Sequence, residues 1–156
     1  MPIPNATGRL VTVQVPGFTR DHHTHAAAPG WLTASFTLSE RRQRRIERGG
    51  ELRALTISDD DDFLIIGFRT ACVSVATSVP DALRCRVTST IPIAAGRGAS
   101  SAAVVAGIIG ARALLDLSLD EAAVAHMACV IDASPSQVHA AIEGHSVATH
   151  ITCDDD

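Results

Sequence analysis

A run of small residues, 91–101, leads directly into a long apolar segment, 102–116, and this junction constrains the fold most. Residues 102–116 are mainly alanine, valine, isoleucine and leucine, a composition that predicts a helix. Gly107 and Gly110 lie inside this helix, where each costs about 1 kcal/mol relative to alanine. We therefore expect a neighbouring element to pack closely against the helix and to compensate for both glycines.

The composition favours a core of small aliphatic side chains. Of the 156 residues, 46% are hydrophobic but only 3% are aromatic, so alanine, valine, isoleucine and leucine must build the core. Such a core suits close packing of helices against a sheet. The apolar content excludes a wholly disordered chain, and one domain is the usual arrangement at this length.

Local patterns predict an α+β chain with three strands, a helix, a fourth strand and then three helices. Strands are expected over residues 9–15, 31–38, 51–57 and 83–88, and helices over residues 63–77, 102–116, 121–131 and 135–144. Strict alternation places Leu83, Cys85 and Val87 on one face of the fourth strand. Ser118 to Glu121 form a capping box before the third helix.

The chain divides into a β-rich part, residues 1–60, and a part built around the small-residue loop, residues 61–144. The first part is mixed in composition and rich in turn residues, whereas the second carries the long apolar segments. Residues 150–156 end in three aspartates, and we expect this tail to be frayed.

Charge and cysteine usage exclude several classes of function. All 13 basic residues are arginines, so a mechanism that needs a lysine is excluded. The net charge of -4 argues against a nucleic-acid partner. No apolar run reaches membrane-spanning length and no signal-peptide pattern begins the chain, so we expect no membrane association and a cytoplasmic location. The four cysteines form no CxxC pair and are expected to be free thiols.

The loop formed by Gly96 to Ser101 has the properties of an anion-binding site. The first N–H groups of a helix have no intrahelical acceptor, and the helix dipole favours negative charge at that end. Glycines let a backbone approach a phosphate closely, and Ser100 and Ser101 add hydroxyls that suit a phosphate or a magnesium ion. The loop matches neither a Walker A loop nor a dinucleotide fingerprint. From these residues alone, an ordinary strand-to-helix connection remains the alternative.

Three blocks of the sequence resemble the GHMP kinases, the family of galactokinase, homoserine, mevalonate and phosphomevalonate kinases. The family's phosphate loop reads Pro-x-x-x-Gly-Leu-Gly-Ser-Ser-Ala-Ala, and residues 92–102 read Pro-Ile-Ala-Ala-Gly-Arg-Gly-Ala-Ser-Ser-Ala. Residues 132–141 are similar to the family's Glu-Gly-His-Pro-Asp-Asn-Val-Ala-Pro-Ala block. Residues 13–19 are similar, more weakly, to its Asn-x-Gly-Pro-Gly-Phe-Asp block. The order and spacing of the three blocks resemble the homoserine kinases most.

This resemblance implies the fold of the family's N-terminal domain, in which a left-handed β-α-β unit belongs to a mixed sheet packed with helices. It implies ATP-dependent phosphorylation of the homoserine hydroxyl, in threonine biosynthesis, with ATP and Mg²⁺ bound. It also implies that a C-terminal domain, which completes the substrate pocket in relatives, is missing from residues 1–156. A homodimer is the arrangement that would replace it.

The resemblance also assigns roles to individual residues. The residues that would cradle the nucleotide are Pro92, Gly96, Arg97, Gly98, Ala99, Ser100, Ser101 and Ala102. Ser100 and Asp132 would bind Mg²⁺, and Asp132 and Gln137 are the catalytic candidates. An ordinary helix-end carboxylate is the alternative for Asp132.

The chain departs from the family's pattern at several positions that matter for chemistry. Arg97 and Ala99 replace the loop leucine and the first loop serine, and Ser101 falls on an alanine position. Asp132 replaces a metal-binding glutamate with a shorter carboxylate, which can still ligate magnesium through water. The remaining polar positions carry Val13, Thr19, Ser134, Ser136 and Gln137. The alternative function is therefore a non-catalytic protein of this fold that retains at most weak nucleotide binding.

Four other clusters have simpler interpretations than a functional site. A solvated loop is favoured over a metal site for His22, His23 and His25. A solvated turn or edge is favoured for Arg41, Arg42, Arg44, Arg45 and Arg48. The run Asp59, Asp60, Asp61 and Asp62 lacks the ligand spacing of an EF-hand, so helix capping is favoured over calcium binding. Inert core thiols are expected at Cys72, Cys85 and Cys129.

Overall fold

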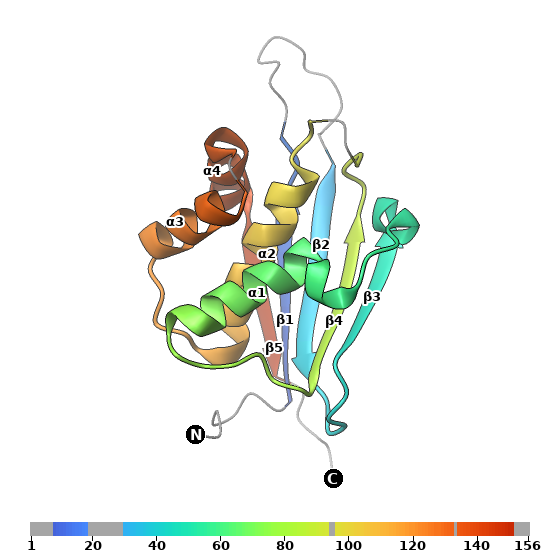
Figure 1. Cartoon of the computed structure of the whole chain (residues 1–156), viewed down its shortest axis with the longest axis vertical. Coiled ribbons are helices and arrows are strands. Elements are labelled where there is room, and N and C mark those ends of the chain that lie inside the picture. The colour runs from blue at the N-terminus through green and yellow to red at the C-terminus, as the bar shows by residue number, and fades with distance from the viewer. Residues whose placement is uncertain (1–7, 19–29, 94–95, 133, 152–156) are drawn as a thin grey trace.

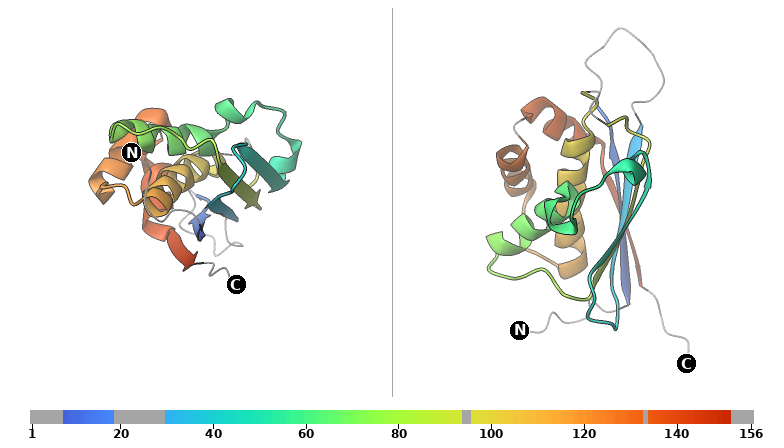
Figure 2. Two further views of the ribbon diagram at one scale, coloured as in Figure 1. Left: turned by 90° about the horizontal axis from the view of Figure 1, so that it is seen from below. Right: turned by 45° about the vertical axis from the view of Figure 1, so that its right-hand side comes forward.

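The computed structural model describes residues 8–18, 30–93, 96–132 and 134–151. Within these residues five strands form one mixed sheet, in the order β3-β4-β2-β1-β5, and four α-helices cover one of its faces (Figures 1 and 2). The strands are β1 (Arg9–Pro16), β2 (Trp31–Leu38), β3 (Arg45–Gly50), β4 (Leu83–Ser89) and β5 (Ser146–Ile151). The helices are α1 (Phe63–Ser74), α2 (Ala99–Leu115), α3 (Glu121–Ile131) and α4 (Pro135–Gly144), with two 3₁₀ turns, η1 (Glu51–Ala54) and η2 (Asp59–Asp61).

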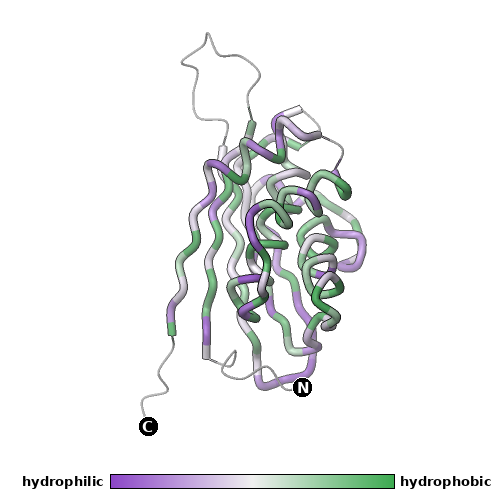
Figure 3. The backbone as a smooth tube through the Cα atoms, turned by 90° about the vertical axis from the view of Figure 1, so that its left-hand side faces the viewer, coloured by the Kyte–Doolittle hydropathy of each residue, from purple (hydrophilic) through white to green (hydrophobic). Residues whose placement is uncertain are grey.

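The structure confirms the α+β class and most of the expected elements, because their patterns match their burial. Leu83, Cys85 and Val87 are buried on the helix-covered face of β4, as the alternation predicts. Figure 3 shows the same alternation of hydrophilic and hydrophobic residues along the strands. No helix among the described residues is both long enough and apolar enough to cross a membrane.

The prediction for the third strand and the prediction for the C-terminal tail are wrong. The third strand is β3, which lies within the basic run instead of over residues 51–57, because Ile46 packs against the core and Gly50, at φ +62°, ends the strand before η1. The tail is not frayed from residue 150, because β5 pairs with β1 from Ser146 to Ile151. Every side chain of β5 is exposed, so backbone pairing forms this strand without any apolar pattern.

One helix cap and one helix end also differ from expectation. The N-cap of α3 is Asp120 rather than Ser118, and its carboxylate accepts a 2.7 Å hydrogen bond from the Ala123 N–H. Helix α1 ends at Ser74, and Ala76 adopts the left-handed conformation at φ 56° just beyond it. The predicted extension to residue 77 is therefore wrong.

The β3-α1-β4 unit is a left-handed crossover. Strands β3 and β4 are parallel neighbours, with Arg45 opposite Arg84 and Gly50 opposite Ser89. In Figure 1 both strands run upward, β4 lies to the left of β3, and α1 lies in front of the sheet. Parallel crossovers are right-handed in about 98% of cases, so this connection is a distinctive property of the fold.

Helix α2 lies at the centre of the core and crosses α1 at two glycines. A Cβ atom on Gly107 would overlap the Leu64 carbonyl oxygen and lie 2.9 Å from the Phe68 nitrogen. A Cβ atom on Gly67 would overlap the Val104 carbonyl oxygen. The close contact between α1 and α2 confirms the expectation that a neighbouring element packs tightly against the glycines of this helix.

The cysteines that the structure describes are free thiols, as expected. Desolvation by burial raises the pKa of Cys72 to about 11 and that of Cys85 to about 12. Thiolate is the reactive form of cysteine, so both side chains are inert packing groups near neutral pH. The histidines of the 22–25 loop, Thr19, Cys153 and the terminal aspartates lie outside the described residues.

Candidate functional site

Two glycines with positive φ shape the loop that precedes α2. Gly96 has φ +66° and Gly98 has φ +80°, a conformation that side-chain-bearing residues rarely adopt. Gly98 is the N-cap of α2 and has no side chain that could cap the helix. The first N–H groups of α2, from Ala99 to Ser101, therefore face outward without an intrahelical acceptor. Helix α2 begins at Ala99, three residues before the expected start at residue 102.

The three blocks that carry the sequence resemblance meet at Gly98. The Phe18 N–H donates a 2.6 Å hydrogen bond to the Arg97 carbonyl, which joins the first block to the loop. A Cβ atom on Gly98 would lie 3.1 Å from the Phe18 Cβ and 3.8 Å from the Gln137 Oε1. A side chain at this position would therefore crowd both neighbouring blocks.

Asp132 follows the last turn of α3, and both loop serines bind its carboxylate. The Ser100 hydroxyl donates to Asp132 Oδ2 at 3.2 Å, and the Ser101 hydroxyl donates to the same oxygen. Ser101 is completely buried, and its Oγ also lies 3.3 Å from Gln137 Oε1. A hydroxyl has one proton to donate, so the Ser101 hydroxyl donates its hydrogen bond to the nearer acceptor, Asp132. The structure thus brings together Ser100, Asp132 and Gln137, which the sequence singled out.

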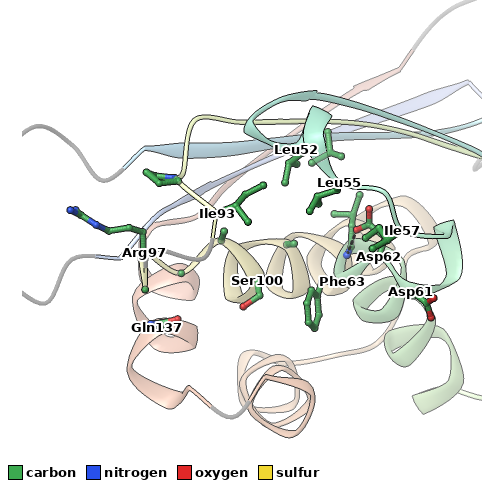
Figure 4. A pocket seen from close by; sticks show the side chains of 17 residues that line it. Leu52, Leu55, Ile57, Asp61, Asp62, Phe63, Ile93, Arg97, Ser100 and Gln137 are labelled. Atoms are coloured by element: carbon green, nitrogen blue, oxygen red, sulfur yellow. Dashed lines mark hydrogen bonds between the residues drawn. The ribbon is translucent and has the colours of Figure 1, made fainter.

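A cavity of about 380 Å³ extends from this loop along α2. In Figure 4, Arg97 and Gln137 lie at one end of the cavity, Asp61 and Asp62 lie at the other, and Leu52, Leu55 and Ile93 lie between them. Phe63 and Ile57 also line it, and with Ile93 they are among the largest exposed apolar side chains of the described chain. The cavity is therefore polar at the loop and apolar along its length.

Sequence reasoning missed the apolar half of this cavity. Leu52, Leu55 and Ile57 were assigned to a strand, whereas η1 and the segment after it turn them toward α2. The available signal was the pair Gly49-Gly50, which ends a strand and begins a turn.

Asp62, the last residue of the acidic run, caps α1 as predicted, whereas Asp59, Asp60 and Asp61 are exposed. The buried Asp62 accepts a 2.9 Å hydrogen bond from the Leu64 N–H and forms a 2.7 Å ion pair with Arg48 Nε. Arg48 also contacts Asp59 at 3.2 Å, and Arg69 contacts Asp60 at 2.9 Å. Among the described residues there is no group of three or more His, Cys, Asp or Glu side chains that could hold a metal ion.

The structure places the other nucleotide-binding candidates as follows. The cavity is lined by Pro92, Gly96, Arg97, Gly98, Ala99 and Ser100. Ala102 is completely buried in α2 and does not line it. Val13 is completely buried in β1, so it offers no polar group to a ligand.

These observations define a class of protein: an α+β domain with a left-handed crossover and a glycine-containing loop at the start of its central helix. The family model described as the GHMP kinases N terminal domain matches residues 67–145. The chain belongs to this family.

Similar proteins include several homoserine kinases. The chain is 34% identical over 142 residues to a homoserine kinase of Synechococcus sp. (strain CC9605), covering 84% of this chain and 44% of the relative. It is 27% identical over 150 residues to a homoserine kinase of Corynebacterium urealyticum, covering 91% of this chain and 47% of that one. The chain thus spans less than half the length of these curated relatives.

Solved structures share the fold. A putative homoserine kinase from Listeria monocytogenes superposes with a TM-score of 0.57 at 25% identity, covering 90% of this chain and 54% of that one. A mevalonate kinase from methicillin-resistant Staphylococcus aureus superposes with a TM-score of 0.55 at 16% identity, covering 90% and 55%. At 16% identity, the likeness to the mevalonate kinase supports only the fold of this chain.

Proposed function

We propose that this chain forms the nucleotide-binding part of an ATP-dependent kinase that phosphorylates the hydroxyl of a small alcohol, with homoserine as the substrate. The observation that carries the proposal is the meeting of Ser100, Ser101 and Asp132 beside the open N-terminus of α2. The homoserine kinases among the relatives support the choice of substrate.

The cavity suits the two chemical halves of ATP. At one end, the outward N–H groups of the first turn of α2 and the helix dipole favour the negatively charged phosphates. Arg97 adds a positive charge at this end. Along the rest of the cavity, Leu52, Leu55, Ile93 and Phe63 offer apolar surface to a flat base. A volume of about 380 Å³ lies within the usual range of small-molecule sites.

Oxygen donors near the loop fit magnesium. Mg²⁺ prefers oxygen ligands, and it usually combines one or two carboxylates with substrate phosphates and water. Ser100 and Asp132 supply a hydroxyl and a carboxylate whose oxygens lie 3.2 Å apart. When bound there, Mg²⁺ would neutralise charge on the phosphates, which is its usual contribution to phosphoryl transfer.

The protein's own residues would act mainly by positioning. Ser101 is buried and holds the Asp132 carboxylate at the loop. Gln137 lies at the cavity wall next to Gly98, where its amide can orient a bound hydroxyl. Positioning of the reacting groups supplies much of the acceleration in phosphoryl transfer.

A second candidate function is a nucleotide-binding protein without catalysis. The observation that favours it is the loss of polar groups where the family's pattern has them. Val13 is buried in the core, and Ser134 and Ser136 stand near the start of α4 where the family's pattern has histidine and aspartate. Under this alternative the loop still binds ATP, but the protein holds no alcohol in line with the bound nucleotide.

A phosphoryl-transfer assay separates the two candidates. We expect the 156-residue chain to form ADP slowly, because few of the expected substrate-orienting groups are present, and homoserine should raise the rate above that of ATP hydrolysis alone. Ser100→Ala should remove the part of the rate that depends on homoserine. ADP formation that is equal with and without homoserine would contradict the kinase proposal and leave the second candidate.

A further inference from the structure

The face of the sheet opposite the helices carries a hollow lined by arginines. This arginine hollow has a volume of about 280 Å³, and the side chains that matter for the argument are those of Ser35, Thr37, Arg45, Glu47, Arg84 and Arg86. Figure 2 shows that the helices lie on the other side of the sheet. The hollow is therefore separated from the nucleotide cavity by the sheet itself.

Strand register brings the arginines together. Arg45 of β3 lies opposite Arg84 of β4, and Glu47 lies opposite Arg86. On the other side of β4, Thr37 and Ser35 of β2 lie opposite the same two arginines. Side chains of directly paired residues share one face of a sheet, and like charges in such pairs are destabilising. The Arg45–Arg84 pair is thus a local charge conflict.

The single carboxylate in the hollow does not resolve this conflict. Glu47 contacts Arg86 at 3.2 Å and Arg45 at 3.7 Å. Arg84 has no ion pair within the described part of the chain, and its Nε is buried without a hydrogen-bond partner. Arg44 also has a buried, unpaired Nε, but its guanidinium lies 3.6 Å from Asp60. Among the three arginines that line the hollow, Arg84 is therefore the one without a counter-charge in the described structure.

We propose that the arginine hollow binds a small molecule that carries a phosphate group, between Arg45 and Arg84. Three arginines and one glutamate give the lining a formal charge of +2, which matches a phosphate dianion. Guanidinium groups bind phosphate oxygens through paired hydrogen bonds, and the anion would supply the acceptor that Arg84 Nε lacks. The Thr37 hydroxyl donates to the Arg9 carbonyl at 3.1 Å, and the Ser35 hydroxyl lies 3.3 Å from that of Thr12, so the arginines supply the main donors to the anion. The hollow is too small for a folded protein segment, which favours a small ligand.

Amide chemical shifts of the ¹⁵N-labelled chain test this site directly. Inorganic phosphate and glycerol 3-phosphate are titrated separately at constant ionic strength, so that screening does not imitate binding. We expect saturable shifts at residues 35, 37, 84 and 86 with at least one probe. Equal affinities would identify free phosphate as sufficient, whereas tighter binding of glycerol 3-phosphate would identify a phosphate ester. Shifts at residues 96–101 report the nucleotide loop separately, so failure at one site is distinguishable from failure at the other.

Two arginine variants make the test specific. Arg84→Gln should weaken binding at the hollow at least ten-fold and leave the loop shifts unchanged. Arg42→Gln removes the same charge from an exposed turn residue outside the hollow and should change the affinity less than two-fold. Arg45→Gln should weaken binding as Arg84→Gln does, and it serves if the latter fails to fold.

Thermal unfolding provides an independent readout, because a ligand that binds only the folded state raises the melting temperature. Phosphate should raise the melting temperature of the parent and not that of Arg84→Gln. Without phosphate, Arg84→Gln should be at least as stable as the parent, because the like-charge pair is gone. The proposal is overturned if neither probe shifts the hollow residues, if Arg84→Gln binds as tightly as the parent, or if only an acidic peptide such as polyglutamate binds.

Discussion

Gly107→Ala is expected to lower the free energy of unfolding by about 2 kcal/mol. The added methyl group would overlap the Leu64 carbonyl oxygen and crowd the Phe68 nitrogen, and both are backbone atoms of α1 that no rotamer change can move. Overpacking of a tight core costs up to about 3 kcal/mol. The better helix propensity of alanine returns about 1 kcal/mol. The helices must separate to admit the methyl group, so the loss dominates.

Urea unfolding followed by circular dichroism measures this change, with Val73→Ala as the control. Val73 lies on α1 and is 65% exposed, so its truncation should alter the free energy by less than about 0.5 kcal/mol. A Gly107→Ala variant as stable as the parent would show that α1 and α2 do not cross at this glycine.

Asp132→Asn should weaken the binding of magnesium-bound ATP at least ten-fold and leave metal-free ATP binding nearly unchanged. Asparagine keeps the size of the side chain and an oxygen that accepts hydrogen bonds from Ser100 and Ser101, so the local structure should persist. It removes the negative charge that a magnesium ion requires. Loss of an interaction with a charged group costs about 1.5–3 kcal/mol, which is about ten-fold or more in affinity.

Calorimetric titration with ATP, with and without Mg²⁺, separates this effect from general damage. Asp81→Asn is the matched control, because it removes the same charge from an exposed residue away from the loop. It should bind magnesium-bound ATP as the parent does. Equal weakening with and without the metal in Asp132→Asn would assign Asp132 a structural role instead of a metal-binding one.

The centre of the fold was predictable because sequence pattern and burial agree there. In α2, every residue from Ser101 to Ala111 is buried, and the small side chains and two glycines in the sequence already require close neighbours. In β1, β2 and β4, one face packs on the helices and the other is open, so alternation identified them.

The edges of the sheet were not predictable from the same signals. Strand β5 has no buried side chain, so only its backbone pairing with β1 defines it. Strand β3 lies in a run of arginines, and the parallel pairing that forms it depends on β4, which is nearly forty residues further along the chain.

The candidate site shows the same division. The loop and Asp132 were recognisable because the glycines, the serines and the family's pattern coincide there. The buried bond from Ser101 to Asp132 was not, because it depends on how the end of α3 packs against the start of α2. The apolar wall of the cavity depends on the turn at Gly50. This wall was not predictable, because the pattern of residues 51–57 predicts a strand there instead of a turn.

The most direct test of the central claim is an amide chemical-shift titration of the chain with ATP and Mg²⁺. The loop at the start of α2 should show the largest shifts, at Gly96 to Ser101, with smaller shifts at Leu52 and Leu55 along the cavity. Ser100→Ala should weaken this binding without moving its location. If ATP and Mg²⁺ leave the amides of residues 96–101 unshifted, or shift only residues outside the cavity, the nucleotide site proposed for this domain is wrong.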